Sequence, residues 1–133
     1  MKPNENQLHR MVLSQRKMLI HDIEEHLREY RPKVVSCYSP PFLISVINDS
    51  IEIASKFNID DVYSMRLFVQ LRWDIAPGYF KQPKIAHVLA QTDRTAAERF
   101  EELTTDGFAE AWENALEYDG DQEWQLQSAG GDS

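Results

Sequence analysis

Apolar residues recur every three or four positions along most of this chain, and that spacing predicts helices. From Asn4 to Tyr30 they form one stripe on a long helix, and the spacing returns from Leu43 to Asn58. The β-branched residues of the second segment would also suit a strand. Its length and the polar group Asn48-Asp49-Ser50 at helical spacing favour a helix. The pattern as a whole predicts an all-α protein.

The stretch from Val62 to Phe80 carries apolar residues around most of a helical circumference. Asp60-Asp61 predicts its start and Pro77-Gly78 its end, because acidic residues suit a helix N-terminus and Pro-Gly cannot continue a helix. The stretch is too short and too charged to cross a bilayer. A helix apolar on most sides is normally surrounded by other helices. We therefore expect it at the centre of the fold.

The segment from Lys33 to Phe42 is predicted to be an ordered crossover loop, because Arg31-Pro32 ends the first helix and Pro40-Pro41 ends any extended piece. Beyond Pro77-Gly78 the chain predicts three short helices. Pro83 suits the first position of one, Thr92 or Asp93 would cap the next, which stops at Asp106-Gly107, and the last covers Phe108 to Leu116. The residues expected to face inward are Ile85, Val88, Leu89, Ala97, Phe100, Leu103, Phe108, Ala111, Trp112 and Ala115.

Length and composition complete this prediction. With 133 residues, 42% apolar and 27% charged, the chain suits one globular domain. We expect a single-domain bundle of about six helices over residues 1–118, around a central buried helix. Residues 119–133 are polar and acidic, and are expected to form a flexible tail. With one cysteine, no internal disulfide can form, and no signal peptide precedes the first helix, so a cytoplasmic location is expected.

Charge is distributed unevenly along the chain. Residues 1–33 hold seven Lys/Arg and five Asp/Glu, residues 34–92 hold five of each, and residues 93–133 hold two Arg and twelve Asp/Glu. Nucleic acid and anionic membranes repel such an acidic last third, whereas a basic protein surface complements it. An acidic face that serves only solubility is the alternative. The candidate partner-binding residues are Glu98, Glu101, Glu102, Glu110, Glu113, Glu117 and Trp124.

No catalytic, cofactor or metal signature stands out. His21 and His26 are five positions apart, about 140 degrees round a helix of 3.6 residues per turn, so they cannot hold one ion together. Cys37 lacks a neighbouring histidine and is expected to be a buried structural thiol. Arg66 and Arg72 interrupt the central helix; pairing with Asp49, Asp61 or Asp74 is expected, with contact to a partner as the alternative. If other helices leave the central one partly uncovered, Trp73, Tyr79 or Phe80 would offer an apolar patch, even to a second copy of this chain.

The central third resembles a known layout. It contains Ala54-Ser55-Lys56-Phe57-Asn58-Ile59, then Asp61, Met65, Phe68-Val69-Gln70-Leu71, Pro77-Gly78-Tyr79-Phe80, Pro83, Ile85 and Val88-Leu89, and finally Ala97-Glu98-Arg99-Phe100 with Leu103. This layout resembles small helical accessory proteins of bacterial type VI secretion effector modules. The resemblance covers roughly residues 54–103 and consists of packing motifs. Asn58 stands where glycine is usual, and Asn tolerates a left-handed turn.

The resemblance implies a non-enzymatic chaperone or co-adaptor that acts on a secreted toxin effector or its adaptor, and it carries over no catalytic residues. An immunity protein that neutralises a toxin through the acidic surface is the alternative within binding proteins. A small metal-dependent hydrolase that uses His21, Glu25 and His26 or a carboxylate pair is the alternative among enzymes. A transcription regulator fits poorly, because no basic recognition helix is present.

Overall fold

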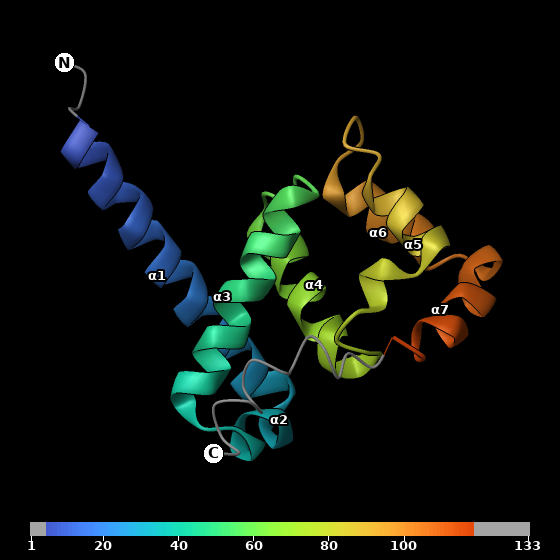
Figure 1. Cartoon of the computed structure of the whole chain (residues 1–133), viewed down its shortest axis with the longest axis horizontal. Coiled ribbons are helices and arrows are strands. Elements are labelled where there is room, and N and C mark those ends of the chain that lie inside the picture. The colour runs from blue at the N-terminus through green and yellow to red at the C-terminus, as the bar shows by residue number, and fades with distance from the viewer. Residues whose placement is uncertain (1–4, 119–133) are drawn as a thin grey trace. The chain divides into compact units, whose positions relative to one another are not determined.

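The structure is a computed structural model that describes residues 5–118, with side chains described from Gln15 onward. The described residues form seven α-helices and two 3₁₀-helices, and contain no strand (Figure 1). The prediction of an all-α fold is thus confirmed. The elements are α1 (Glu5–Tyr30), α2 (Pro32–Cys37), α3 (Pro40–Lys56), α4 (Val62–Asp74), η1 (Tyr79–Lys81), α5 (Pro83–Leu89), α6 (Ala96–Leu103), η2 (Asp106–Phe108) and α7 (Ala109–Ala115).

The chain divides into two compact units, and the division falls within α3, between Asn48 and Asp49. The first unit contains α1, α2 and the start of α3. Its buried apolar side chains are Ile23, Leu27, Leu43, Val46 and Ile47. Arg16 on α1 donates a hydrogen bond to the side chain of Asn48 at 2.9 Å, which joins the two helices at that end of the unit.

The prediction of a loop between the first two long helices is wrong in part, because most of its first half forms the helix α2. Pro32 occupies the first turn of α2 and Pro40 begins α3. A proline lacks the backbone N–H that the first turn leaves unbonded, so each of these prolines starts a helix here. This helix is the one that the prediction of about six lacked. Val35 and Tyr38, in the segment predicted to be a loop, are half-buried.

The second unit contains the rest of α3 and all later elements. Within it α5 packs beside α6, and α7 lies against η1 (Figure 1). Met65, Phe68 and Val69 of α4 are buried together with Tyr79 and Phe80 of η1. Phe68 lies at the centre of this group, 5.4 Å from the ring of Phe80 and 5.5 Å from the ring of Tyr79, measured between ring centroids.

Helix α4 begins where the acidic pair predicted, since the side chain of Asp61 accepts a hydrogen bond from the backbone N–H of Ser64 at 2.8 Å. It ends at Asp74, and Tyr79 begins a separate 3₁₀-turn. The helix was expected to be surrounded on most sides, but one face of it is buried. Val62 and Tyr63 are 46% and 81% exposed, while the buried residues Ser64, Met65, Phe68, Val69 and Arg72 share one face.

The end of α3 is a tight left-handed turn at Asn58, whose φ is 55°. The backbone N–H of Asn58 donates to the carbonyl of Ser55 at 3.0 Å, and that of Ile59 donates to the carbonyl of Ala54 at 3.1 Å. These two bonds form a Schellman motif, which satisfies carbonyls that the helix end leaves free. Ile59 is buried directly after the turn. The prediction that asparagine tolerates this turn is confirmed.

We expect Asn58→Gly to leave the free energy of unfolding within about 0.5 kcal/mol of wild type, because glycine adopts positive φ without a steric penalty. Asn58→Val should lower it by about 1–2 kcal/mol, because a β-branched side chain clashes in this conformation. Urea denaturation followed by circular dichroism measures both. Equal stability of the two variants would contradict the assigned backbone conformation.

Candidate functional site

The candidate partner-binding carboxylates lie on α6, on α7 and in the turn that follows α7. Glu98, Glu101, Glu110, Glu113 and Glu117 are exposed and Glu102 is half-buried. Trp124, the seventh candidate, lies outside the described residues. In α7 Glu110 and Glu113 are three positions apart, which places them on one side of the helix, and Glu117 follows in the turn after it. The helices therefore present carboxylates to solvent at the positions predicted.

Helix α7 is fixed to the rest of the second unit by its own residue Trp112. The indole Nε1–H donates to the carbonyl of Leu103 at the end of α6 at 2.7 Å, and the indole ring lies 5.9 Å from the ring of Tyr79. Ala111 and Ala115 are buried on the same side of α7. The inward side predicted for this helix is confirmed, and it fixes which side of α7 carries the glutamates.

The N-cap of α6 is Thr95, two or three residues beyond the predicted cap at Thr92 or Asp93. The Thr95 hydroxyl accepts from the backbone N–H of Glu98 at 3.1 Å, and the Glu98 carboxylate accepts from the backbone N–H of Thr95 at 3.1 Å. This reciprocal arrangement is a capping box. Because the helix begins there, Ala96 is buried and Ala97, expected inward, is exposed. Phe100 and Leu103 are buried as predicted.

Two of the candidate carboxylates are already engaged within the protein. Hydrogen bonds from the backbone N–H and the hydroxyl of Thr95 lower the pKa of Glu98. Glu102 accepts a close hydrogen bond from the guanidinium of Arg94. The side chains of Glu101, Glu110, Glu113 and Glu117 make no hydrogen bond or ion pair within residues 15–118. These four are the carboxylates that a partner could meet without breaking a contact.

Replacing Thr95 by Ala is expected to lower the free energy of unfolding by about 1 kcal/mol, since the N-cap oxygen is lost. Thermal or urea unfolding at neutral pH measures the loss. Thr92→Ala is the matched control and should change stability by less than about 0.5 kcal/mol, because Thr92 lies outside the helix. If Thr92→Ala lost more stability than Thr95→Ala, the cap would lie at Thr92, one of the two residues first predicted.

Glu98 should also contribute a pH dependence to stability. The pKa of Glu98 is lower in the folded chain than its usual value of 4.5, so its contribution is present above that value and is lost as the pH falls through the folded pKa. The stability difference between wild type and Glu98→Gln should therefore shrink on acidification from pH 7 to pH 3. A difference that grows over this interval would contradict the capping role.

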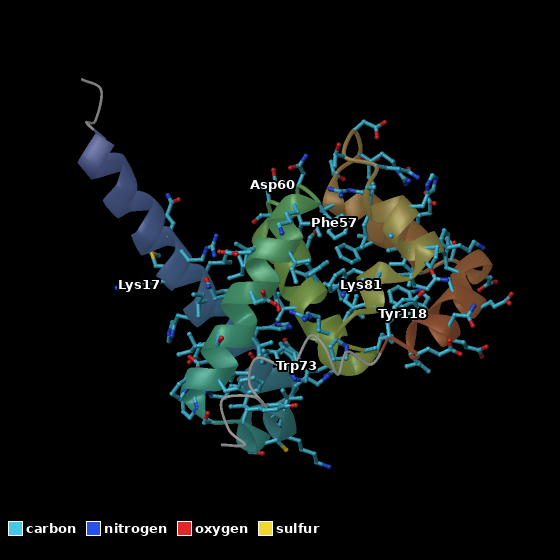
Figure 2. All side chains as sticks on the ribbon, in the orientation of Figure 1. Lys17, Phe57, Asp60, Trp73, Lys81 and Tyr118 are labelled. Carbon is cyan, nitrogen blue, oxygen red and sulfur yellow. The ribbon has the colours of Figure 1, made fainter. Side chains whose placement is uncertain are left out.

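Arg99 lies at the junction of three chain segments and is 1% exposed. Its Nη1 donates to the carbonyls of Phe57 at 2.7 Å and Leu89 at 2.6 Å, and its Nη2 donates to the carbonyl of Asn58 at 3.2 Å. These carbonyls belong to the ends of α3 and α5, where the helix dipole favours a cation. Desolvation by burial lowers the pKa of Arg99, and Asp60 opposes this effect. Figure 2 shows Phe57 and Asp60 close to the turn that follows α3.

Arg72 is fully buried and pairs as predicted with Asp49, at 3.3 Å. It also donates to the hydroxyl of Ser50 at 2.7 Å and to the carbonyl of Pro77 at 2.8 Å, and its guanidinium lies 5.7 Å from the ring centre of Phe80. These contacts connect α3, α4 and the turn before η1. The guanidinium is thus used inside the second unit and is not available to a partner.

Tyr79 and Phe80 do not form the apolar patch that a partly uncovered central helix would offer, since both are buried. Burial raises the pKa of Tyr79 well above its usual value, while the nearby Arg72 guanidinium opposes that shift. The Tyr79 hydroxyl donates to the carbonyl of Phe68 at 3.0 Å. Trp73 is half-buried. The large exposed apolar side chains lie elsewhere: Met18, Tyr30, Ile44, Val62, Tyr63 and Leu116.

The remaining candidates from the sequence do not assemble into a site. Cys37 is exposed, not buried as expected, because it lies at the end of α2 instead of inside a loop. The ring of His26 lies against that of Tyr30 of its own helix, tilted by 42°, with ring centroids 4.8 Å apart. Over residues 5–118 no three His, Cys, Asp or Glu side chains gather in a group that could hold a metal ion.

These observations define an all-α protein with an acidic surface on its last two α-helices. Searches against protein-family models, curated proteins and solved structures found no match for this chain. None of the helices in the described part of the chain is long and apolar enough to span a membrane.

Proposed function

We propose that this chain is a non-enzymatic protein-binding factor whose acidic surface on α6 and α7 docks on a basic surface of another protein. The observation that carries the proposal is that Glu101, Glu110, Glu113 and Glu117 are exposed and make no ion pair among the described residues. The capping box and Trp112 fix the helices that carry them. The carboxylates are therefore held in place and remain free for a cationic partner.

Electrostatics of this kind act mainly on the rate and specificity of association. A single exposed ion pair contributes about 0–1 kcal/mol, so the binding depends on several pairs formed together. Complementary charge over a surface raises the association rate and makes it sensitive to salt. The proposal therefore expects an interaction that is strong at low ionic strength and weak at high ionic strength.

The resemblance over roughly residues 54–103 supports a finer proposal, in which the partner is a secreted toxin effector or its adaptor and the chain serves as a chaperone or co-adaptor. An immunity protein that covers a basic toxin cleft would use the same acidic surface. The two roles give different results in cells. An immunity protein rescues cells that express the toxin, whereas a chaperone changes the stability or loading of the effector.

The test is affinity capture from the native cell lysate with tagged full-length protein at low and high salt. We expect a basic protein to be retained at low salt and released at high salt. Glu113→Lys should weaken its capture and Glu110→Lys/Glu113→Lys should abolish it. Glu25→Lys is the matched control, since it makes the same charge change at an exposed helical position on α1. Equal capture by all variants, or no capture at either salt, would contradict the proposal.

A further inference from the structure

The end of α7 exposes an apolar side chain beside its carboxylates. Leu116 directly follows α7 and is 53% exposed, and its backbone is still helical, with φ −62° and ψ −24°. The backbone N–H of Leu116 donates to the carbonyl of Glu113 at 3.2 Å. Trp112 is half-buried and lies four positions before Leu116, so the two side chains share one side of the helix. Together they form an apolar row that is most exposed at Leu116.

A row of carboxylates runs next to this apolar row. Glu113 lies three positions before Leu116 and three positions after Glu110, so it is a neighbour of both on the helix surface. Glu117 follows in the turn after α7. These three carboxylates are exposed and make no hydrogen bond or ion pair within residues 15–118. The solvent-facing side of α7 therefore carries an apolar row and an acidic row beside each other.

Contacts with the rest of the second unit hold both rows in place. The Trp112 indole donates to the carbonyl of Leu103 and lies against the ring of Tyr79. The backbone N–H of Gly78 donates to the carbonyl of Tyr118 at 2.9 Å, which attaches the turn after α7 to the chain just before η1. A surface that is ordered before binding loses little conformational entropy when a partner docks on it.

We propose that the partner segment recognised by this surface is a basic amphipathic helix, an inference that rests on the proposed function of the acidic surface. The apolar side chains of that helix cover Leu116 and the exposed part of Trp112. Its Lys or Arg side chains meet Glu110, Glu113 and Glu117. The charge of the acidic row selects against apolar segments that carry no positive charge.

The arrangement in two neighbouring rows favours a helix over an extended segment. Successive side chains of an extended segment point to opposite faces, so one such segment cannot place an apolar row and a basic row side by side. Residues three and four apart on a helix form such rows. Their repeat of about 6 Å along the axis is also the spacing of Trp112 and Leu116, because both helices rise by the same amount per residue.

The experiment is fluorescence anisotropy of the full chain with three labelled synthetic peptides of about 18 residues, long enough to form a helix. The first peptide carries Leu and Lys at helical spacing, the second has Gln in place of every Leu, and the third has the same Leu and Lys in strict alternation. We expect wild type to bind the first peptide about tenfold more tightly than the other two, because only the first can cover both rows. Equal binding of the three peptides would overturn the inference.

Leu116→Ser should weaken binding of the first peptide by about tenfold, because the apolar contact is lost. The factor should be the same at low and high salt, since apolar burial is not screened by ions. Ile44→Ser is the matched control, because Ile44 is an exposed aliphatic residue of the first unit, at 41%, and it should leave the binding unchanged. Equal effects of the two variants would contradict a role of Leu116.

Glu113→Lys separates this inference from the proposed function on which it rests. It should weaken binding of the first and second peptides alike, because the two carry the same positive charge. If it does so while wild type shows no preference for the first peptide, the acidic surface binds cations but the amphipathic helix is the wrong partner. If no peptide binds, or Glu113→Lys has no effect on either peptide, both proposals are contradicted.

Discussion

Replacing Arg99 by Ala is expected to lower the free energy of unfolding by about 3–5 kcal/mol. The buried guanidinium donates to the carbonyls of Phe57, Asn58 and Leu89. Hydrogen bonds from a charged donor contribute about 1.5–3 kcal/mol each, and a buried carbonyl that loses its donor adds a desolvation penalty of about 1–3 kcal/mol. A globular domain has a total stability of about 5–15 kcal/mol, so this loss would remove a large part of it.

Arg99→Lys and Arg94→Ala test the physical reason for this loss. Lysine keeps the charge but concentrates its donors on one nitrogen, so it cannot reach carbonyls at the ends of both α3 and α5 and should recover only part of the stability. Arg94 is half-exposed and its pair with Glu102 lies near the surface, so Arg94→Ala should cost less than about 1 kcal/mol. Urea denaturation of the three variants measures which of them loses the most stability. A loss for Arg99→Ala no larger than that for Arg94→Ala would contradict the capping role.

Phe68→Ala is expected to destabilise the protein by about 3–5 kcal/mol, the range for removing a buried aromatic side chain. Phe68 has no exposed surface and lies among the rings of Phe57, Tyr79 and Phe80. Its removal leaves a cavity bordered by aromatic rings that cannot close over it. The Tyr79 hydroxyl, which donates to the backbone carbonyl of Phe68, keeps its acceptor. The loss should therefore come from packing and not from a broken hydrogen bond.

Tyr63→Ala is the control for this prediction, because Tyr63 lies on the same helix and is 81% exposed. We expect it to change stability by less than about 0.5 kcal/mol. Thermal unfolding followed by calorimetry measures both variants. Similar losses at the two positions would mean that α4 is not oriented with Phe68 inward.

Local signals in the sequence predicted much of the fold. Acidic residues placed the start of α4 at Asp61, Pro83 marked the start of α5, and asparagine took the left-handed turn at position 58. Each of these features depends on a residue and its immediate neighbours. The solvent-facing positions of the glutamates on α6 and α7 were predicted for the same reason, since helical spacing alone separates them from the buried residues.

Two predictions were wrong, the loop at α2 and the cap of α6, because the local sequence allowed more than one interpretation at each place. Proline ends a helix that precedes it but can begin one that follows, and Pro32 does both, whereas only the first was predicted. At α6 several residues could cap the helix, and only Thr95 has glutamate three positions later, as the capping box requires. The spacing of Thr95 and Glu98 was a signal that could have identified the cap.

The roles of the two buried arginines could not be predicted fully, because they depend on tertiary contacts. Asp49 was among the expected partners of Arg72, but the carbonyl of Pro77 and the hydroxyl of Ser50 were not. Arg99 binds carbonyls 41 and 42 residues earlier in the chain. Backbone carbonyls carry no sequence signature, since every residue has one. Only the packing of α6 against the ends of α3 and α5 reveals why an arginine stands there.

The contacts of Arg99 have a consequence for how the second unit comes apart. One guanidinium completes the ends of α3 and α5 from a position on α6, so displacing α6 leaves both of these ends incomplete. Segments that share a contact of this kind open together as one cooperative unit, and hydrogen exchange of the backbone amides within such a unit reports a common free energy of opening. The turn at Asn58 and the end of α5, far apart in the sequence, are thereby coupled in their opening.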